Sequence, residues 1–252
     1  MGRTSRLLVY DSAHMESGFE QQQQRLSGAP ATDVATDSNF LRRVFAWMFT
    51  GLIITGIVSA VLGSNQALMD QIESNGAVVI GVIIAQLVLV MVLIFALPRI
   101  SPALGVALFF LYAATVGVTF AIIFQLYTTE SVYTTFGITA LMFGSLAAWG
   151  YFTDIDLSRL GPILFGALIG LILATIVNIF FASSTLYWIT TYAGVIIFAG
   201  LTAYDMQKLK GIAEQGVSGT EGQRLSIYGA LSLYLDFINL FLFLLRIFGQ
   251  QR

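Results

Sequence analysis

Two aspartates stand inside long apolar runs of this 252-residue sequence, and their type and placement give them the best capacity for chemistry. Asp205 follows Gly200-Leu-Thr-Ala-Tyr204 near the C-terminal end of one apolar run, and Asp236 lies well inside the next run. A carboxylate at the centre of a membrane helix costs a few kcal/mol, so it marks a functional site with a partner nearby.

The remaining composition excludes most other kinds of chemistry. The chain is 57% hydrophobic and only 10% charged, whereas soluble domains are about 25% charged, which argues against a water-soluble enzyme. The net charge of −2 carries no basic excess, which argues against nucleic acid as a partner. The absence of cysteine excludes disulfides, thiolate metal sites and a cysteine nucleophile. The single histidine, His14, lies in a polar segment, which argues against serine–histidine catalysis and histidine-rich metal sites.

Seven apolar runs follow the polar N-terminal segment, and each is near the roughly 20 residues that a membrane-spanning helix needs. They are continuously apolar, whereas barrel strands alternate, so helices are favoured. We therefore expect an all-α membrane protein, with a disordered cytoplasmic tail over 1–40 and a seven-helix transmembrane domain over 41–252, joined by tight connections such as Asn65–Asn75. The expected spans are 44–63, 78–97, 103–125, 133–152, 161–182, 186–207 and 227–245.

The N-terminal segment has two interpretations. It contains the run Gln21–Gln24 and no apolar stretch long enough for a core, which is typical of disorder. It does not resemble a signal peptide, because the first long apolar run starts near residue 44. A leader without function is the simpler interpretation, and an arm that docks a partner is the alternative.

Basic residues predict the orientation, because lysine and arginine in short loops prefer the cytoplasmic side. All the basic residues before the last span fall on the N-terminal side of the membrane, which predicts a cytoplasmic N-terminus. They are Arg3, Arg6, Arg25, Arg42, Arg43, Arg99, Arg159, Lys208, Lys210 and Arg224. Arg246 and Arg252 follow the last span and depart from this pattern. The length of 227–245 favours a full crossing, and a segment that dips in and returns is the alternative.

Geometry suggests that the two aspartates are each other's partners. The last two spans are expected to form a hairpin with its tip at Gly216–Gly222. If the first helix continues to about residue 214 and the second begins near 223, both aspartates lie level to within roughly one helical turn. Two carboxylates at that depth cannot easily both be ionised, so they should share a proton and form a pH-responsive latch. The ionised pair would offer oxygen ligands to a cation such as calcium. The alternative is that each aspartate merely bonds a neighbouring helix, for example through Asn239 or Tyr234.

Other polar residues in the spans have more ordinary interpretations. Arg99 follows the second span on the side of Asp205, so it is either a counter-charge or an ordinary cytoplasmic anchor. Interhelical hydrogen bonding explains polar side chains in spans better than ligand binding does. The residues that would give the aspartates polar support are Gln86, Asn178, Tyr204 and Asn239.

Gly166 and Gly170 have the spacing of small residues at a close helix contact. We therefore expect them to form a packing face on the fifth span.

The C-terminal part carries a family resemblance. The segment Leu231-Ser-Leu-Tyr-Leu-Asp-Phe-Ile-Asn-Leu-Phe-Leu-Phe-Leu-Leu-Arg-Ile-Phe248 closely resembles the C-terminal signature of the Bax inhibitor-1 family. Gly200–Leu209 resembles a second motif of that family, and span number and spacing agree over residues 40–252. The variant here resembles the bacterial inner-membrane branch.

The resemblance implies a seven-helix fold in which the last helix is central and wrapped by the other six. It implies a pH-sensitive calcium leak gated by an aspartate pair, which would be Asp205 and Asp236, with Arg99 as the latch and calcium as the transported ion. Some relatives carry an acid in the second helix, where this chain has Gln86. Bacterial relatives are also linked to a membrane-bound protease and to stress responses.

Three functions follow from these features. The first is the pH-gated cation leak, which is not an enzyme and needs no cofactor. The second is a regulatory protein that binds another membrane protein. The third is an intramembrane aspartyl protease, because two aspartates on adjacent helices are its minimum; against it, Leu233-Tyr-Leu precedes Asp236 where a protease would have Gly-x-Gly.

Overall fold

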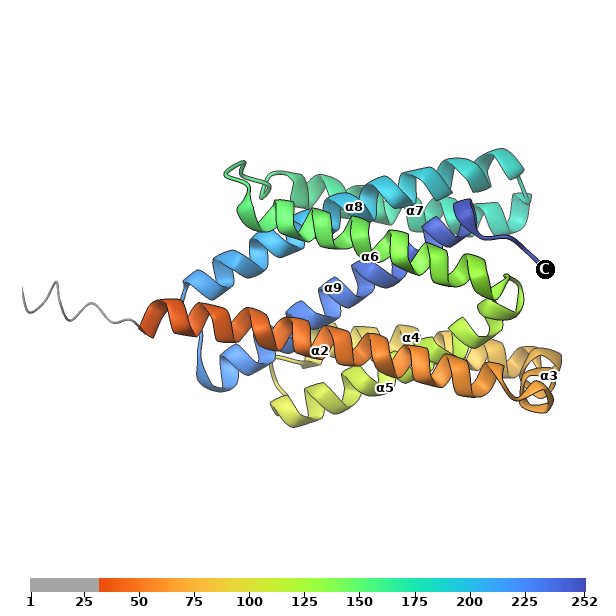
Figure 1. Cartoon of the computed structure of the whole chain (residues 1–252), viewed down its shortest axis with the longest axis horizontal. Coiled ribbons are helices and arrows are strands. Elements are labelled where there is room, and N and C mark those ends of the chain that lie inside the picture. The colour runs from red at the N-terminus through yellow and green to blue at the C-terminus, as the bar shows by residue number, and fades with distance from the viewer. Residues whose placement is uncertain (1–31) are drawn as a thin grey trace, which may run out of the picture.

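The computed structural model describes residues 32–252, and over that range it is a helical bundle (Figure 1). Every helix except α3 is long and apolar enough to cross a membrane, which confirms the expected all-α fold with seven spans. The helices are α2 (Thr32–Gly63), α3 (Gln66–Ser74), α4 (Gly76–Ala96), α5 (Pro102–Gln125), α6 (Thr129–Phe152), α7 (Leu160–Phe181), α8 (Ser184–Glu214) and α9 (Gly219–Phe248). His14 and Gln21–Gln24 lie outside the described residues.

The structure contains one helix that the expected spans do not include, and two of the spans are longer than their apolar runs. The connection Asn65–Asn75 contains α3, whose start is capped by the Asn65 side chain accepting a hydrogen bond from Leu68 N at 3.2 Å. Its apolar side is anchored by the buried Met69. The helices α8 and α9 also extend toward each other beyond the expected apolar runs, because Leu209 and Ala213 continue to pack in the core after the sequence turns polar.

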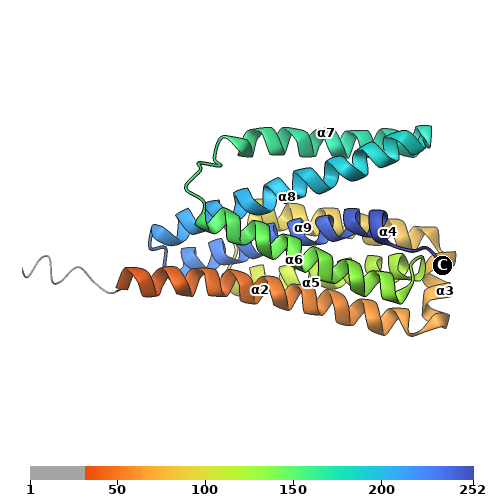
Figure 2. The same cartoon turned by 45° about the horizontal axis from the view of Figure 1, so that its top comes forward.

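The C-terminal helix α9 is the most buried of the seven spans. It packs against α2, α5, α6 and α8, whereas α4 packs mainly on α5 and α7 packs on α8. Figure 2 shows α7 as the outermost helix of the bundle. The expectation that all six other spans wrap α9 is therefore not confirmed, because four of them supply its main contacts.

A buried hydroxyl joins three helices near the middle of the bundle. The Tyr234 side chain of α9 is fully buried, and its hydroxyl lies 2.6 Å from the Thr55 hydroxyl of α2. Thr55 in turn donates to the Ala113 carbonyl oxygen of α5 at 2.9 Å. The Tyr234 ring meets Phe109 edge-on, with centroids 5.5 Å apart. Polar and aromatic contacts thus fix α9 against α2 and α5 together.

Glycines permit the closest helix approaches in the bundle. A Cβ atom on Gly150 of α6 would overlap the backbone of Ala203 on α8, and one on Gly117 of α5 would lie 2.8 Å from the Thr55 carbonyl oxygen. Gly166 and Gly170 behave differently, because nothing lies within 4 Å of a Cβ built on either. The expected packing face on the fifth span is therefore wrong, since these glycines point outward.

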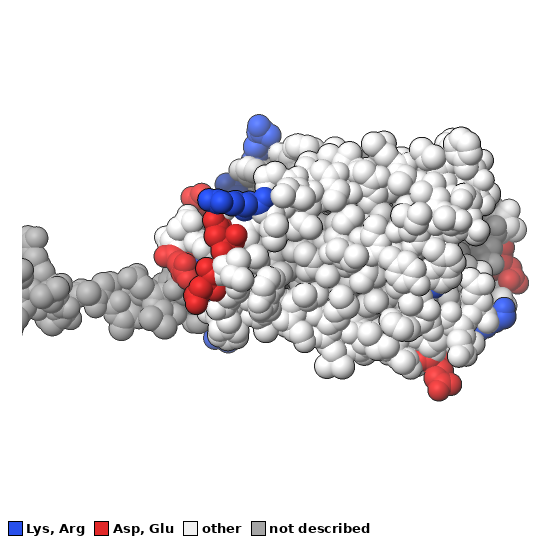
Figure 3. All heavy atoms as spheres, turned by 90° about the horizontal axis from the view of Figure 1, so that it is seen from above, with Lys and Arg blue, Asp and Glu red and all other residues white. Residues whose placement is uncertain are grey.

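Charged side chains gather at the two ends of the molecule, as Figure 3 shows on one face. We call the end where α2 begins and the α8–α9 hairpin turns the basic end. It holds Arg42, Arg43, Arg99, Arg159, Lys208, Lys210 and Arg224. The C-terminus lies at the opposite end (Figure 1), because α9 runs without interruption from Gly219 to Phe248. A segment that dips in and returns is therefore wrong.

Substitution of Gly150 by Val should destabilise the bundle by about 1–3 kcal/mol, because the added side chain overlaps the α8 backbone. Denaturant unfolding in detergent micelles would measure this loss. Gly166→Val is the matched control, since its side chain enters open space, and its effect should stay within about 0.5 kcal/mol. Equal losses in the two variants would contradict the assigned α6–α8 contact.

Candidate functional site: two aspartates between α8 and α9

The last two helices form an antiparallel hairpin whose register is set by side-chain contacts along its length. Near the tip, Leu209 of α8 lies against Gly229 of α9. Near the far end, the Phe243 ring packs on Gly194, where an added Cβ would come within 2.6 Å of it. The helices thus stay in contact across the full depth of the bundle.

Asp205 is held between these contacts by α9. Its carboxylate oxygen Oδ2 accepts a hydrogen bond from the Ser232 hydroxyl, and the carboxylate is partly buried. Ser232 precedes Asp236 by four residues, so the two side chains project from the same face of α9. Asp236 therefore lies about 6 Å, just over one helical turn, further along the hairpin than the point where Asp205 is bound.

Asp236 is enclosed within the bundle. The residue is only 4% exposed, and its Oδ2 atom has no hydrogen-bond partner among the described residues. A buried carboxylate oxygen without a donor is costly in an apolar interior. The role of the pair as a pH sensor or cation site stays a prediction.

Ser232 is the contributor to the site that sequence reasoning missed. It lies in the segment Leu231–Asp236, which carries the family resemblance, and the sequence analysis does not identify its hydroxyl as a hydrogen-bond donor. The available signal was its spacing, since a polar residue one turn before an intramembrane carboxylate shares its helix face.

Arg99 does not reach the aspartates in this structure. Its side chain is exposed, and Nη1 donates to the Phe95 carbonyl oxygen at 3.1 Å. Among the side chains that the structure describes, in residues 39–72 and 74–252, the only ion pair is Lys210 with Glu214, at 3.9 Å. A different arginine holds the α4–α5 connection to α9, because Arg224 Nε donates to the Ile100 carbonyl oxygen at 2.9 Å.

The four residues expected to give polar support bond elsewhere. Gln86 Nε2 donates to the Thr115 carbonyl oxygen at 2.8 Å, which links α4 to α5. Asn178 Oδ1 accepts from the Ser183 backbone N at 2.9 Å and closes the end of α7. Asn239 Nδ2 donates to a carbonyl of its own helix, and the Tyr204 ring packs against α7. Their hydrogen bonds in the described part of the chain do not include either aspartate.

The aspartate pair alone does not make a complete metal site. Among the described residues there is no group of three or more His, Cys, Asp and Glu side chains that could hold a metal ion. Calcium takes six to eight oxygen ligands. Two carboxylates and one hydroxyl supply fewer oxygen ligands than calcium takes, so calcium binding at the pair stays a prediction.

The seven spans and the intramembrane carboxylates define a multi-pass membrane protein. The family model described as "Inhibitor of apoptosis-promoting Bax1" matches residues 37–252. The chain belongs to this family, the Bax inhibitor-1 family, which confirms the resemblance seen in the sequence.

Bacterial relatives are similar over most of their length. The chain is 48% identical over 215 residues to Inner membrane protein YbhL of Escherichia coli, covering 84% of this chain and 92% of that protein. A relative from Deinococcus radiodurans is 42% identical over 213 residues, with 84% and 90% covered. One from Borreliella burgdorferi is 41% identical over 221 residues, with 87% and 95% covered.

Substitution of Ser232 by Ala should destabilise the protein by about 1–3 kcal/mol, because Asp205 loses its donor inside the bundle. Ser226→Ala is the control, since that hydroxyl bonds only a carbonyl of its own helix. A double-mutant cycle with Asp205→Ala, read by denaturant unfolding in micelles, should give a clear coupling energy. Additive effects of the two substitutions would show that the contact contributes nothing.

Proposed function

We propose that the protein is a pH-sensitive cation leak, with calcium as the transported ion, gated by Asp205 and Asp236. The observation that carries the proposal is the enclosed carboxylate of Asp236, which has an unpaired oxygen and lies one helical turn beyond Ser232, the residue that binds the Asp205 carboxylate. Acidic side chains inside a membrane bundle commonly mark ion or proton paths.

The proposed gate works through the charge of the pair. Two carboxylates in one apolar site hold a shared proton at lower cost than two charges. Loss of that proton leaves a doubly charged site that repels itself and attracts a cation. Since Ser232 already ties Asp205 to α9, this change acts directly on the contact between α8 and α9.

Arg99 is proposed as the latch of a second conformation. Its guanidinium is exposed at the basic end, so an ion pair with Asp205 requires the α4–α5 connection to move inward. The bond between Arg224 and Ile100 couples this connection to the start of α9. A shift of α9 is thus a physical route from the aspartates to Arg99.

An inner-membrane location with a cytoplasmic N-terminus is also proposed. It is supported by the gathering of lysine and arginine at the basic end. The similarity to Inner membrane protein YbhL of Escherichia coli also supports it. The docking role considered for the N-terminal segment concerns residues outside the described range and stays a prediction.

A leak fits the site better than intramembrane proteolysis. A protease must bring a peptide bond between its two aspartates, which requires open space beside both. Asp236 is instead enclosed, and the cavity lined by Phe120 and Phe241 includes neither aspartate.

In proteoliposomes, calcium flux through the wild-type protein should vary with pH, and Asp236→Asn and Asp205→Asn should abolish that variation. Asparagine imitates the protonated acid, so each variant should keep the flux of the acidic wild-type limit at every pH. Calcium-indicator dye inside the vesicles, measured from pH 5 to 8, would record it.

Asp70→Asn is the control for this flux measurement, because Asp70 is exposed on α3, away from the hairpin. It should leave the pH profile unchanged. Wild-type profiles in both aspartate variants would overturn the proposed gate.

Single cysteines would test the orientation, because the chain has no native cysteine. Ser158→Cys at the basic end should react with an impermeant maleimide only after the cells are opened. Ser64→Cys at the opposite end should react in spheroplasts with an intact inner membrane. Both serines are exposed, and the reverse pattern would invert the proposed topology.

A further inference from the structure

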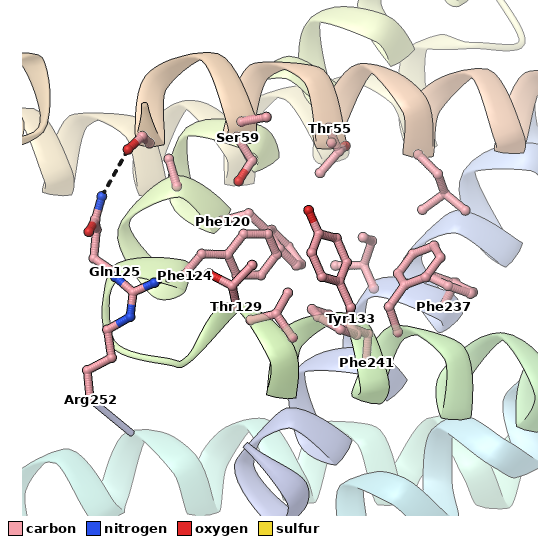
Figure 4. Close-up of a pocket in the computed structure, with 18 residues that line it drawn as sticks. Thr55, Ser59, Phe120, Phe124, Gln125, Thr129, Tyr133, Phe237, Phe241 and Arg252 are labelled. Carbon is pink, nitrogen blue, oxygen red and sulfur yellow. Dashed lines mark hydrogen bonds between the residues drawn. The ribbon is translucent and has the colours of Figure 1, made fainter. Parts of the chain in front are cut away.

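A cavity of about 570 Å³ lies in the half of the bundle opposite the basic end (Figure 4). Residues of α2, α5, α6 and α9 line it, together with the C-terminal Arg252. Its walls are mainly apolar and include the aromatic side chains Phe120, Phe124, Phe237 and Phe241. The volume falls within the roughly 300–1,000 Å³ of typical small-molecule sites.

The cavity opens sideways toward the surface that faces lipid. Gly56 and Ala60 of α2 line it and are exposed. Tyr133 and Phe136 of α6 line it from the other side and are 73% and 47% exposed. A molecule dissolved in the bilayer can therefore enter along the seam between α2 and α6.

One buried polar atom inside the cavity has no partner. The Ser59 hydroxyl oxygen is buried and forms no hydrogen bond in the described structure, and Figure 4 shows it directed into the cavity. Buried polar atoms in proteins are rarely left unpaired, so we expect a water molecule to complete the hydrogen bonding of Ser59 inside the cavity.

The mouth of the cavity carries a positive charge held in place by the backbone. Arg252 N donates to the Leu126 carbonyl oxygen at 3.1 Å, and Thr128 N donates to the Gln250 carbonyl oxygen at 2.8 Å. These bonds place the Arg252 guanidinium beside Thr129, with Nη2 at 3.1 Å from its hydroxyl. No aspartate or glutamate is among the residues that line the cavity.

We propose that this cavity binds a single-chain anionic amphiphile, such as a fatty acid, taken from the bilayer. The hydrocarbon chain lies along the phenylalanine walls, and the carboxylate pairs with Arg252 at the mouth. Charge complementarity selects an anion, since a guanidinium repels a cation entering by this route. The volume suits one chain better than a two-chain phospholipid. This inference stands apart from the proposed leak and uses neither aspartate.

The test measures oleate binding to the full-length protein in phosphatidylcholine nanodiscs, with oleyl alcohol as the uncharged comparison. Wild-type protein should bind oleate saturably and more tightly than the alcohol. Gly56→Leu should reduce binding of both by about tenfold or more, because its side chain fills the cavity without a clash. Ala60→Leu is a second blocking variant with the same expected result.

Arg252→Gln should weaken oleate binding by about tenfold and leave oleyl alcohol binding unchanged, because only the charged headgroup loses a partner. Gly166→Leu and Arg246→Gln are matched controls. Gly166 faces open space on α7, and Arg246 lies over the Tyr187 and Phe243 rings, away from the cavity.

Three results would overturn the assignment. Wild-type affinity in both Gly56→Leu and Ala60→Leu, each with unchanged thermal unfolding, would show that the cavity is not the site. An equal loss of oleate affinity in the Arg246→Gln control would show that Arg252 acts only through the overall charge of the surface. Complete displacement of oleate by a few mole per cent of phosphatidylglycerol would identify a phospholipid headgroup as the ligand instead.

Discussion

A carboxylate inside a hydrocarbon layer must find its hydrogen-bond donors in the protein, because the surrounding lipid offers none. In this bundle the donor to Asp205 is Ser232, one helical turn from the enclosed Asp236. The contact therefore favours one register of α8 against α9, since sliding either helix would leave the Asp205 carboxylate without its hydrogen-bond donor. The packing of Phe243 on Gly194 and of Leu209 on Gly229 agrees with the same register. The hydrogen bond to Asp205 and the packing of apolar side chains thus favour the same arrangement of the hairpin.

The spans and the two aspartates could be predicted from the sequence because hydropathy in a membrane is a strong local signal. The helix α3 could not, because its nine residues are too few to give a clear period, and its capping by Asn65 is a matter of geometry. The extra turns of α8 and α9 do not follow from hydropathy, and they enter the sequence analysis only as the condition for placing the two aspartates level. Leu209 is buried by tertiary contacts after the apolar run has ended, and such contacts extend over residues that hydropathy assigns to a loop.

Which face a helix turns inward is the information that a single sequence carries least well. Gly166 and Gly170 have the spacing of a packing motif yet face open space, whereas the isolated Gly150 meets the α8 backbone. The same holds for the charged residues. Arg99 was expected to be either a counter-charge to Asp205 or a cytoplasmic anchor, and its side chain is exposed, whereas Arg224 bonds into the neighbouring connection. Side of the membrane follows from local composition, but partner choice depends on helix rotation.

The burial of α9 also bears on how the protein is made. The most buried span is also the last of the seven along the sequence, and N-terminal parts of a chain begin to fold during synthesis. Until α9 enters the bilayer, the surfaces of α2, α5, α6 and α8 that receive it lack their partner. Thr55 then has no Tyr234 hydroxyl beside it, and Asp205 has no Ser232. The nascent bundle is thus an open assembly with exposed polar groups, and insertion of the final helix is the step that completes it.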